Sequence, residues 1–422
     1  MKYIKKFIEV YLLFYFIIFT GFRYQVANPA ILHVSTIILE VLLALWLLYM
    51  LVNNKDPVFP KDPAYYVVFG LAFLTSSIHS IGLAESFIEL HLFSITALLF
   101  VGLLSWVKWG SSRKDVLNSL LWVGLIYNGI KIMQMASTNK FLLTCNDRTG
   151  LPNKTAGYVT LVLILSLSLF LNDRDKKKSL LPIIGMISST VIIFFMGSRG
   201  GYGGAIAGIL LTLFIYYVST GNFKISSVII IVSLVLVVPV VGTLVIRSNT
   251  CEFVTATGEI GTYVTGAWSN NINTRFELWD TAIQIIKRFP VFGAGPGTFP
   301  IFAKPRFDPH PTVFVHAHNL YLNVFAERGI VGLITGAGLI FIIVRTAFKR
   351  KDLLSKMIVV GMFGAVLVQG LVDVVLLEPF IPRFLFSIIA VLLVRESEDV
   401  SGSCTQSDIG RKGEIHNAEN NK

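Results

Sequence analysis

The feature that most constrains this chain is a series of long apolar stretches that contain almost no charged residues. A helix that crosses the hydrocarbon core of a membrane, about 30 Å thick, needs roughly 20 such residues. Only 14% of the 422 residues are charged, whereas a soluble globular chain has about 25%. We therefore predict an all-α membrane protein with about twelve transmembrane helices. The predicted spans are 4–22, 31–52, 64–81, 86–107, 115–136, 155–172, 179–197, 201–219, 226–246, 329–346, 355–374 and 380–395.

Lys and Arg are shared unevenly between the alternate loops and span ends, with eighteen in one set and six in the other. Because positive residues favour the cytoplasmic side, the richer set is predicted to be cytoplasmic, and both termini with it. The same loops carry the excess of positive charge, which is +11 for the whole chain. This charge therefore sets the orientation of the helices, and we expect no nucleic-acid partner.

We predict one polytopic membrane domain, residues 1–396, followed by a polar tail, residues 397–422, which we expect to be disordered and cytoplasmic. Residues 247–328 form a long, partly helical loop between spans nine and ten, on the periplasmic side. Inside this loop, apolar residues at helical spacing predict an amphipathic helix over 274–289. The glycines and proline of residues 293–297 predict a tight turn after it.

Two arginines lie at the outer side of this topology. Arg199 belongs to the Gly-Ser-Arg-Gly-Gly segment between spans seven and eight, and Arg275 opens the amphipathic helix. A guanidinium binds phosphate oxygens with two parallel hydrogen bonds, so this pair suits the diphosphate of a lipid in the bilayer. The open alternatives are that Arg199 only extends toward the lipid head groups and that Arg275 only faces solvent.

Other ionisable groups reach the same side from two later segments. His316, His318 and Asn319 precede span ten, and Asp373 lies at the outer end of span eleven. Histidine titrates near neutral pH and can take a proton from a sugar hydroxyl group. The alternatives are ordinary interfacial histidines and an Asp373 that pairs with Arg383 at a helix end.

Three segments carry a family resemblance. They are Gly-Ser-Arg-Gly-Gly at 197–201, the stretch from Arg275-Phe-Glu-Leu-Trp-Asp-Thr-Ala to Pro-Val-Phe-Gly-Ala-Gly at 290–295, and His-Ala-His-Asn-Leu-Tyr-Leu-Asn-Val-Phe-Ala-Glu-Arg-Gly-Ile-Val-Gly-Leu at 316–333. These segments resemble the O-antigen ligase and polymerase superfamily of bacterial envelopes, and the chain looks most like the O-antigen ligases of enteric bacteria. The resemblance covers roughly residues 145–395.

The resemblance implies that O-polysaccharide is transferred from undecaprenyl diphosphate to the lipid A-core oligosaccharide, at the periplasmic face of the bacterial inner membrane. It implies His318 as the catalytic base and Arg199 and Arg275 as ligands of the donor diphosphate. Three residues have supporting roles: His316, Asn319 and Asp373. We expect no cofactor and no metal, because diphosphate is a good leaving group and the arginines can neutralise its charge.

Other functions remain open at this point. An O-antigen polymerase uses the same donor but joins two lipid-linked repeats, and a protein O-oligosaccharyltransferase would glycosylate a protein. A transporter of lipid-linked glycans would predict mid-span charges and broken helices in two matching halves, which the sequence does not display. Whether Cys145 and Cys251 form a disulfide also stays open.

Overall fold

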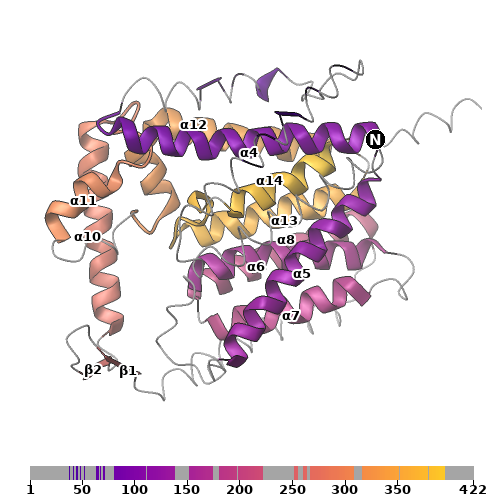
Figure 1. Cartoon of the computed structure of the whole chain (residues 1–422), viewed down its shortest axis with the longest axis horizontal. Coiled ribbons are helices and arrows are strands. Elements are labelled where there is room, and N and C mark those ends of the chain that lie inside the picture. The colour runs from indigo at the N-terminus through magenta and orange to yellow at the C-terminus, as the bar shows by residue number, and fades with distance from the viewer. Residues whose placement is uncertain are drawn as a thin grey trace, which may run out of the picture.

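The fold is described by a computed structural model. It describes residues 80–110, 112–137, 152–173, 180–196, 198–221, 251–254, 260–263, 267–307, 316–350, 352–378 and 380–394, together with scattered positions between 38 and 71. Within these residues the structure is mainly helical, and most of the helices run side by side in one bundle (Figure 1).

Among the described residues, eight apolar helices form the bundle. Six are long and apolar enough to cross a membrane: α4 (Leu83–Gly110), α5 (Arg113–Ser137), α6 (Pro152–Asn172), α8 (Arg199–Thr220), α12 (Leu320–Phe348) and α13 (Leu353–Gly370). Two are apolar but shorter: α7 (Leu180–Met196) and α14 (Phe380–Leu393). These helices indicate a membrane protein, in agreement with the sequence.

The eight helices match eight of the twelve predicted spans to within a few residues, apart from α12, which begins before its predicted span. The predicted spans at 4–22 and 226–246 lie outside the described residues, and those at 31–52 and 64–81 are described only at scattered positions. The count of twelve, the sidedness of the loops and the disordered tail therefore remain predictions.

Helices α8 and α13 pack closely because small residues face each other along their contact. A Cβ placed at Gly208 would lie 3.0 Å from the carbonyl oxygen of Gly361, and a Cβ placed at Gly361 would lie 2.1 Å from Thr212 Oγ1. Small residues allow such close approach between membrane helices, where dispersion contacts between tightly packed surfaces are a main source of association. This contact fixes the start of α8 beside the end of α13.

The predicted long loop contains more regular structure than the sequence indicated. Its amphipathic helix is α10 (Ala267–Arg288), which runs across one end of the bundle (Figure 1) and starts earlier than predicted. A short helix, α11 (Phe299–Phe307), follows. Before α10, strands β1 (Cys251–Val254) and β2 (Ile260–Tyr263) pair antiparallel, with Cys251 opposite Tyr263. The sequence did not predict this hairpin, in which local strand pairing satisfies backbone groups that no helix takes up. The other described elements are helical, as predicted.

The predicted glycine turn after α10 is confirmed, since Gly293, Gly295 and Gly297 all have positive φ angles. The turn is attached to α12 where that helix bends at Gly329, which has φ 64° and ψ −168°. Four backbone hydrogen bonds join residues 290–295 to α12, among them Ala294 N to Ala326 O at 2.9 Å and Gly295 N to Glu327 O at 2.9 Å. The span-like part of α12 thus begins after Gly329, where the sequence predicted span ten to begin.

A small second core holds these outer elements together. It is made by buried apolar residues of α10, the glycine turn, α11 and the start of α12: Leu278, Ala282, Ile285, Ala294, Phe299, Ala303, Ala317 and Ala326. Burial of apolar surface in this core attaches α10, which carries Arg275, to the segment that carries the two histidines.

Candidate functional site

The two histidines lie in a sharp corner, residues 316–319, directly before α12; we call it the histidine corner. Asn319 caps the helix, because its Oδ1 accepts from Leu322 N at 3.0 Å, and its Nδ2 donates to Leu371 O at 3.0 Å. His318 has φ 48°, a left-handed conformation that is uncommon for residues other than glycine. Such a backbone costs on the order of 1–3 kcal/mol and persists only where its surroundings hold it.

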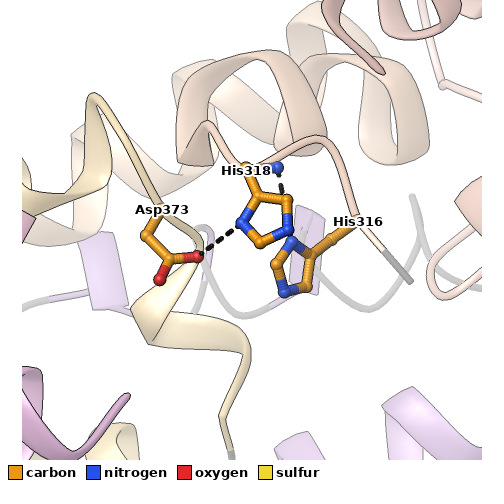
Figure 2. A group of neighbouring side chains, drawn as sticks. All are labelled: His316, His318 and Asp373. Atoms are coloured by element: carbon orange, nitrogen blue, oxygen red, sulfur yellow. Dashed lines mark hydrogen bonds and ion pairs between the residues drawn. The ribbon is translucent and has the colours of Figure 1, made fainter. Parts of the chain in front are cut away.

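His318 and Asp373 are hydrogen-bonded across two segments of the chain. His318 Nδ1 lies 3.2 Å from Asp373 Oδ1, and Figure 2 shows the ring of His318 between Asp373 and His316. Asp373 lies between α13 and a short 3-10 helix, η3 (Val375–Leu377), and its Oδ1 also accepts from Val374 N at 2.8 Å. Burial raises the pKa of Asp373, but the hydrogen bond and the charge of His318 lower it more, to about 2.

The hydrogen bond to Asp373 determines which ring nitrogen of His318 can accept a proton. Because an ionised carboxylate only accepts hydrogen bonds, Nδ1 of His318 carries the proton and donates it to Asp373. In the neutral form of the ring, Nε2 is then the nitrogen without a proton. The side chain of His318 is 24% exposed, whereas that of Asp373 is 4% exposed. The pair therefore offers an accessible base that is oriented from behind by a buried carboxylate.

His316 has a different environment, although it is only two residues away. Its ring packs edge-on against that of His318, with centroids 4.4 Å apart, and its Nδ1 accepts from His318 N at 3.3 Å. Burial lowers the pKa of His316, and the neighbouring His318 lowers it by more than Asp373 raises it, so that the pKa lies at about 3. His316 is therefore neutral near pH 7 and supports the corner as a packed, uncharged ring.

The burial of His316 predicts an acid-sensitive corner. The pKa of His316 is lower in the folded protein than in the unfolded chain, so between these two values only the unfolded chain binds a proton at this residue. The free energy of unfolding therefore falls as pH drops from about 6.5 toward about 3. Melting temperatures of purified protein in EDTA-containing buffer at pH 7.5 and pH 5 should fall more for wild type than for His316→Asn. Equal losses in the two proteins would show that His316 is not the sensitive group.

The two arginines also come together. Arg199 is the first residue of α8, behind its cap Ser198, and lies near enough to Arg275 of α10 for the two positive charges to repel each other. The start of α8 adjoins Asp373, since a Cβ at Gly200 would lie 2.6 Å from Val372 Cγ2. Two like charges at one place indicate a site that is suited to an anion.

Some residues of this region were not singled out from the sequence. Lys154 at the start of α6 forms an ion pair with Glu378 after η3, and its charge acts on His316. Asn153 joins the neighbouring elements, because its Oδ1 accepts from Ser198 Oγ at 2.7 Å and its carbonyl oxygen accepts from Gln369 Nε2 at 2.8 Å. The available signal was position alone: these polar residues lie at predicted outer span ends.

The sequence alternative in which Asp373 pairs with Arg383 is not the arrangement found. Asp373 is hydrogen-bonded to His318, and Arg383 lies within α14 with 1% of its surface exposed. The structure thus brings together five of the six candidate residues by described contacts or charges, in two groups: His316, His318 and Asp373 in one, and Arg199 and Arg275 in the other. The sixth, Asn319, shapes the corner as a helix cap.

The first group also has the donor set of a small metal site. His316, His318 and Asp373 each offer one ligand atom, and these atoms lie within 4.8 Å of one another. Three protein ligands of this type suit a catalytic zinc ion. Metal independence accordingly remains a prediction that requires a direct test.

An apolar cavity of about 830 Å³ adjoins the site inside the bundle. It lies between α4, α12, α13 and α14, and it begins at Leu320 and Tyr321, directly after the histidine corner. Glu89 and Arg328 are among the few charged residues in its wall. Its size and its apolar lining suit a hydrocarbon chain.

Comparison with known proteins finds a family resemblance over part of this chain. Residues 184–337 match a family model that is described as O-antigen ligase. The match supports membership of the O-antigen ligase superfamily. The matched segment runs from α7 into α12 and includes both arginines and the histidine corner, while Asp373 lies beyond it. This superfamily covers ligases and polymerases, so the match does not decide between the two reactions.

One similar protein is an uncharacterized protein of Haemophilus influenzae, which is 27% identical over 270 residues. The aligned region is 60% of this chain and 63% of that protein. The chain therefore spans less than two thirds of the length of the relative.

Proposed function

We propose that this member of the O-antigen ligase superfamily transfers O-antigen polysaccharide from undecaprenyl diphosphate to the lipid A-core oligosaccharide, at the periplasmic face of the inner membrane. The observation that carries the proposal is the His318–Asp373 hydrogen bond beside a site where two arginines repel each other. A base and a receptor for an anion are the two groups that transfer from a lipid diphosphate requires.

The proposed reaction is a single displacement. His318 Nε2 takes the proton of an acceptor sugar hydroxyl while that oxygen attacks the anomeric carbon of the donor. The bond between this carbon and the diphosphate oxygen breaks, and the diphosphate leaves with the bonding electrons. The proton remains on His318, whose positive charge is stabilised by the carboxylate of Asp373. Such a displacement inverts the anomeric centre.

Arg199 and Arg275 have the complementary role. Negative charge accumulates on the diphosphate as it leaves, and fixed positive charge is most effective where that charge develops. A diphosphate that lies between the two guanidinium groups would offset their mutual repulsion. The adjoining apolar cavity, which begins at Tyr321, would hold a hydrocarbon chain of a lipid substrate.

An O-antigen polymerase is the second candidate, because the matched superfamily covers both reactions. The two differ only in the acceptor. In vitro transfer with the purified full chain, lipid-linked O-polysaccharide and lipid A-core therefore tests the proposal, with a second lipid-linked repeat as the competing acceptor. Product on lipid A-core supports the ligase, and lengthened lipid-linked polymer supports the polymerase.

The same assay tests the predicted independence from metal. We expect transfer to continue in excess EDTA and without nucleotide, because the arginines supply the positive charge. Loss of transfer in EDTA that a divalent cation restores would contradict this prediction and would make His316, His318 and Asp373 the natural ligands. A glycosylated protein, or movement of lipid without transfer, would instead favour the oligosaccharyltransferase or the transporter.

Replacing either arginine by lysine should weaken donor binding although the charge is kept. A lysine cannot form the two parallel hydrogen bonds of a guanidinium, and one hydrogen bond to a charged group contributes about 1.5–3 kcal/mol, so we expect a loss of about tenfold or more for Arg199→Lys and Arg275→Lys. Binding of labelled lipid diphosphate to purified protein measures this loss. Arg288→Lys at the other end of α10 is the matched control. Wild-type affinity in both test variants would contradict diphosphate binding at these positions.

A further inference from the structure

Two polar residues at the start of α12 are buried as deeply as its apolar residues. Asn323 is 0% exposed and Glu327 is 3% exposed. They are four residues apart, so they lie on the same face of the helix. Asn323 Nδ2 donates to Glu327 Oε2 at 3.1 Å. Neither residue has a role in the reaction proposed above, yet burial of a charged or polar side chain is costly unless each polar atom has a partner.

The partners of these two side chains are backbone amides at opposite ends of the site. Asn323 Oδ1 accepts from Ala317 N at 2.9 Å, inside the histidine corner. Glu327 Oε1 accepts from Phe299 N at 3.1 Å, at the first turn of α11. The two side chains therefore connect the histidine corner to the glycine turn and α11, and so to the small core that holds α10.

The three hydrogen bonds of Asn323 and Glu327 restrict which residue types can replace them. The amides of Ala317 and Phe299 can only donate, so each side chain must present an oxygen outward. Between the two side chains one donor is then required, and the amide group of Asn323 supplies it. A carboxylate at 327 and a carboxamide at 323 satisfy all three hydrogen bonds.

The connection acts directly on the backbone of His318. Ala317 is 0% exposed and stands between the two histidines, and the next residue, His318, has φ 48°. This conformation is unfavourable for a side chain with a Cβ atom, so the chain would leave it if its neighbours were released. A change in φ of His318 would rotate its ring away from Asp373, which lies 3.2 Å from Nδ1.

We propose that Asn323 and Glu327 are positioning residues, which hold the histidine corner in its strained conformation and thereby keep His318 aligned with Asp373. The effect on transfer rests on the proposed function, whereas the effect on the corner does not. Asn323 holds Ala317 directly, and Glu327 orients Asn323 while it anchors α11. They touch neither the acceptor nor the donor.

Single substitutions and their combination test the proposal. In Glu327→Gln, the new amide donor faces the amide donor of Asn323; in Asn323→Asp, two carboxylates face each other. The double variant N323D/E327Q reverses the central hydrogen bond, since the new carboxylate at position 323 would accept from both Ala317 N and the amide of residue 327. Asp280→Asn is the control, because Asp280 also pairs with a residue four positions on, Gln284, but on an exposed face.

We expect each single variant to lose about 100-fold in the turnover rate with nearly unchanged donor binding, since displacement of a catalytic group by about 1 Å has effects of this size. The double variant should recover to within about threefold of wild type, and the control should equal wild type. Lost activity without recovery in the double variant, or full activity in both single variants, would overturn the proposal.

Hydrogen exchange measured by mass spectrometry separates this result from the proposed function. The peptide that contains Ala317 should exchange faster in both single variants and at the wild-type rate in the double variant, whether or not any glycan is transferred. If this pattern appears in a protein that transfers no O-polysaccharide, the proposed function fails and the positioning role stands. If exchange at Ala317 does not respond to any of the three variants, the positioning role fails.

Discussion

His318→Ala is expected to lower the rate of glycan transfer by about 10²- to 10⁴-fold, the usual contribution of a general base. Donor binding should persist, because Arg199 and Arg275 belong to other helices and their charges are unchanged. The substitution should therefore lower the turnover rate and leave the affinity for the donor nearly unchanged. It is measured by quench-flow or time-point assays at saturating donor, next to a binding assay with the same preparation.

The matched control is His91→Ala, which removes an exposed imidazole from α4. It should leave transfer unchanged. His318→Gln provides a second test of the same idea, since it keeps a polar side chain of similar length but cannot take a proton. Near-wild-type turnover in the purified alanine and glutamine variants would show that another group removes the proton of the acceptor.

Asp373→Asn is the second substitution with a large expected effect, again about 10²-fold or more. Asparagine keeps the shape of the side chain but cannot stabilise a positive charge on His318. Its amide group can also donate to Nδ1, which would leave the proton of His318 on the wrong nitrogen. Turnover should fall while donor affinity and melting temperature change little, and Asp280→Asn is the control for this change of residue type.

The pH range over which Asp373 acts in the wild-type protein follows from its pKa, which His318 holds at about 2 despite burial. Since this folded pKa lies below the ordinary value near 3.8, the contribution of the carboxylate is present above pH 4 and is lost only as pH falls toward about 2. The carboxylate should thus stay ionised from pH 6 to pH 8, which the carboxylate infrared band of Asp373, obtained as the difference between wild type and variant, measures directly. A band that titrates over this range would mean that Asp373 is not a fixed carboxylate.

Much of the helical framework was predictable from the sequence, because long apolar stretches allow few other structures. The start of the membrane-spanning part of α12 was also predictable, since a long apolar stretch begins directly after Gly329, which has a positive φ angle in the structure. The hairpin of β1 and β2 was not predicted. Its pairing depends on which two short segments meet, and neither segment has a strong alternating pattern.

Within the site, residue types were predictable but partners were not. Arginine and histidine at outer span ends indicated anion binding and proton transfer. The pairing of His318 with Asp373 joins residues 55 positions apart, and Arg383 was an equally reasonable partner in the sequence. Lys154 and Glu378 were missed for the same reason, because an ion pair between two distant helix ends leaves no periodic signal.

The close contact of α8 with α13 makes the middle of both helices sensitive to substitution. Arg199 stands at the end of one of these helices and Asp373 just beyond the end of the other, so their separation depends on the spacing of two helix axes. Any larger side chain at Gly208 or Gly361 would force those axes apart, since a Cβ would lie 2.9 Å from Ala365 Cβ in the first case and 2.1 Å from Thr212 Oγ1 in the second. Substitutions that abolish function should therefore map to the middle of α8 and α13 as well as to the candidate site at their ends.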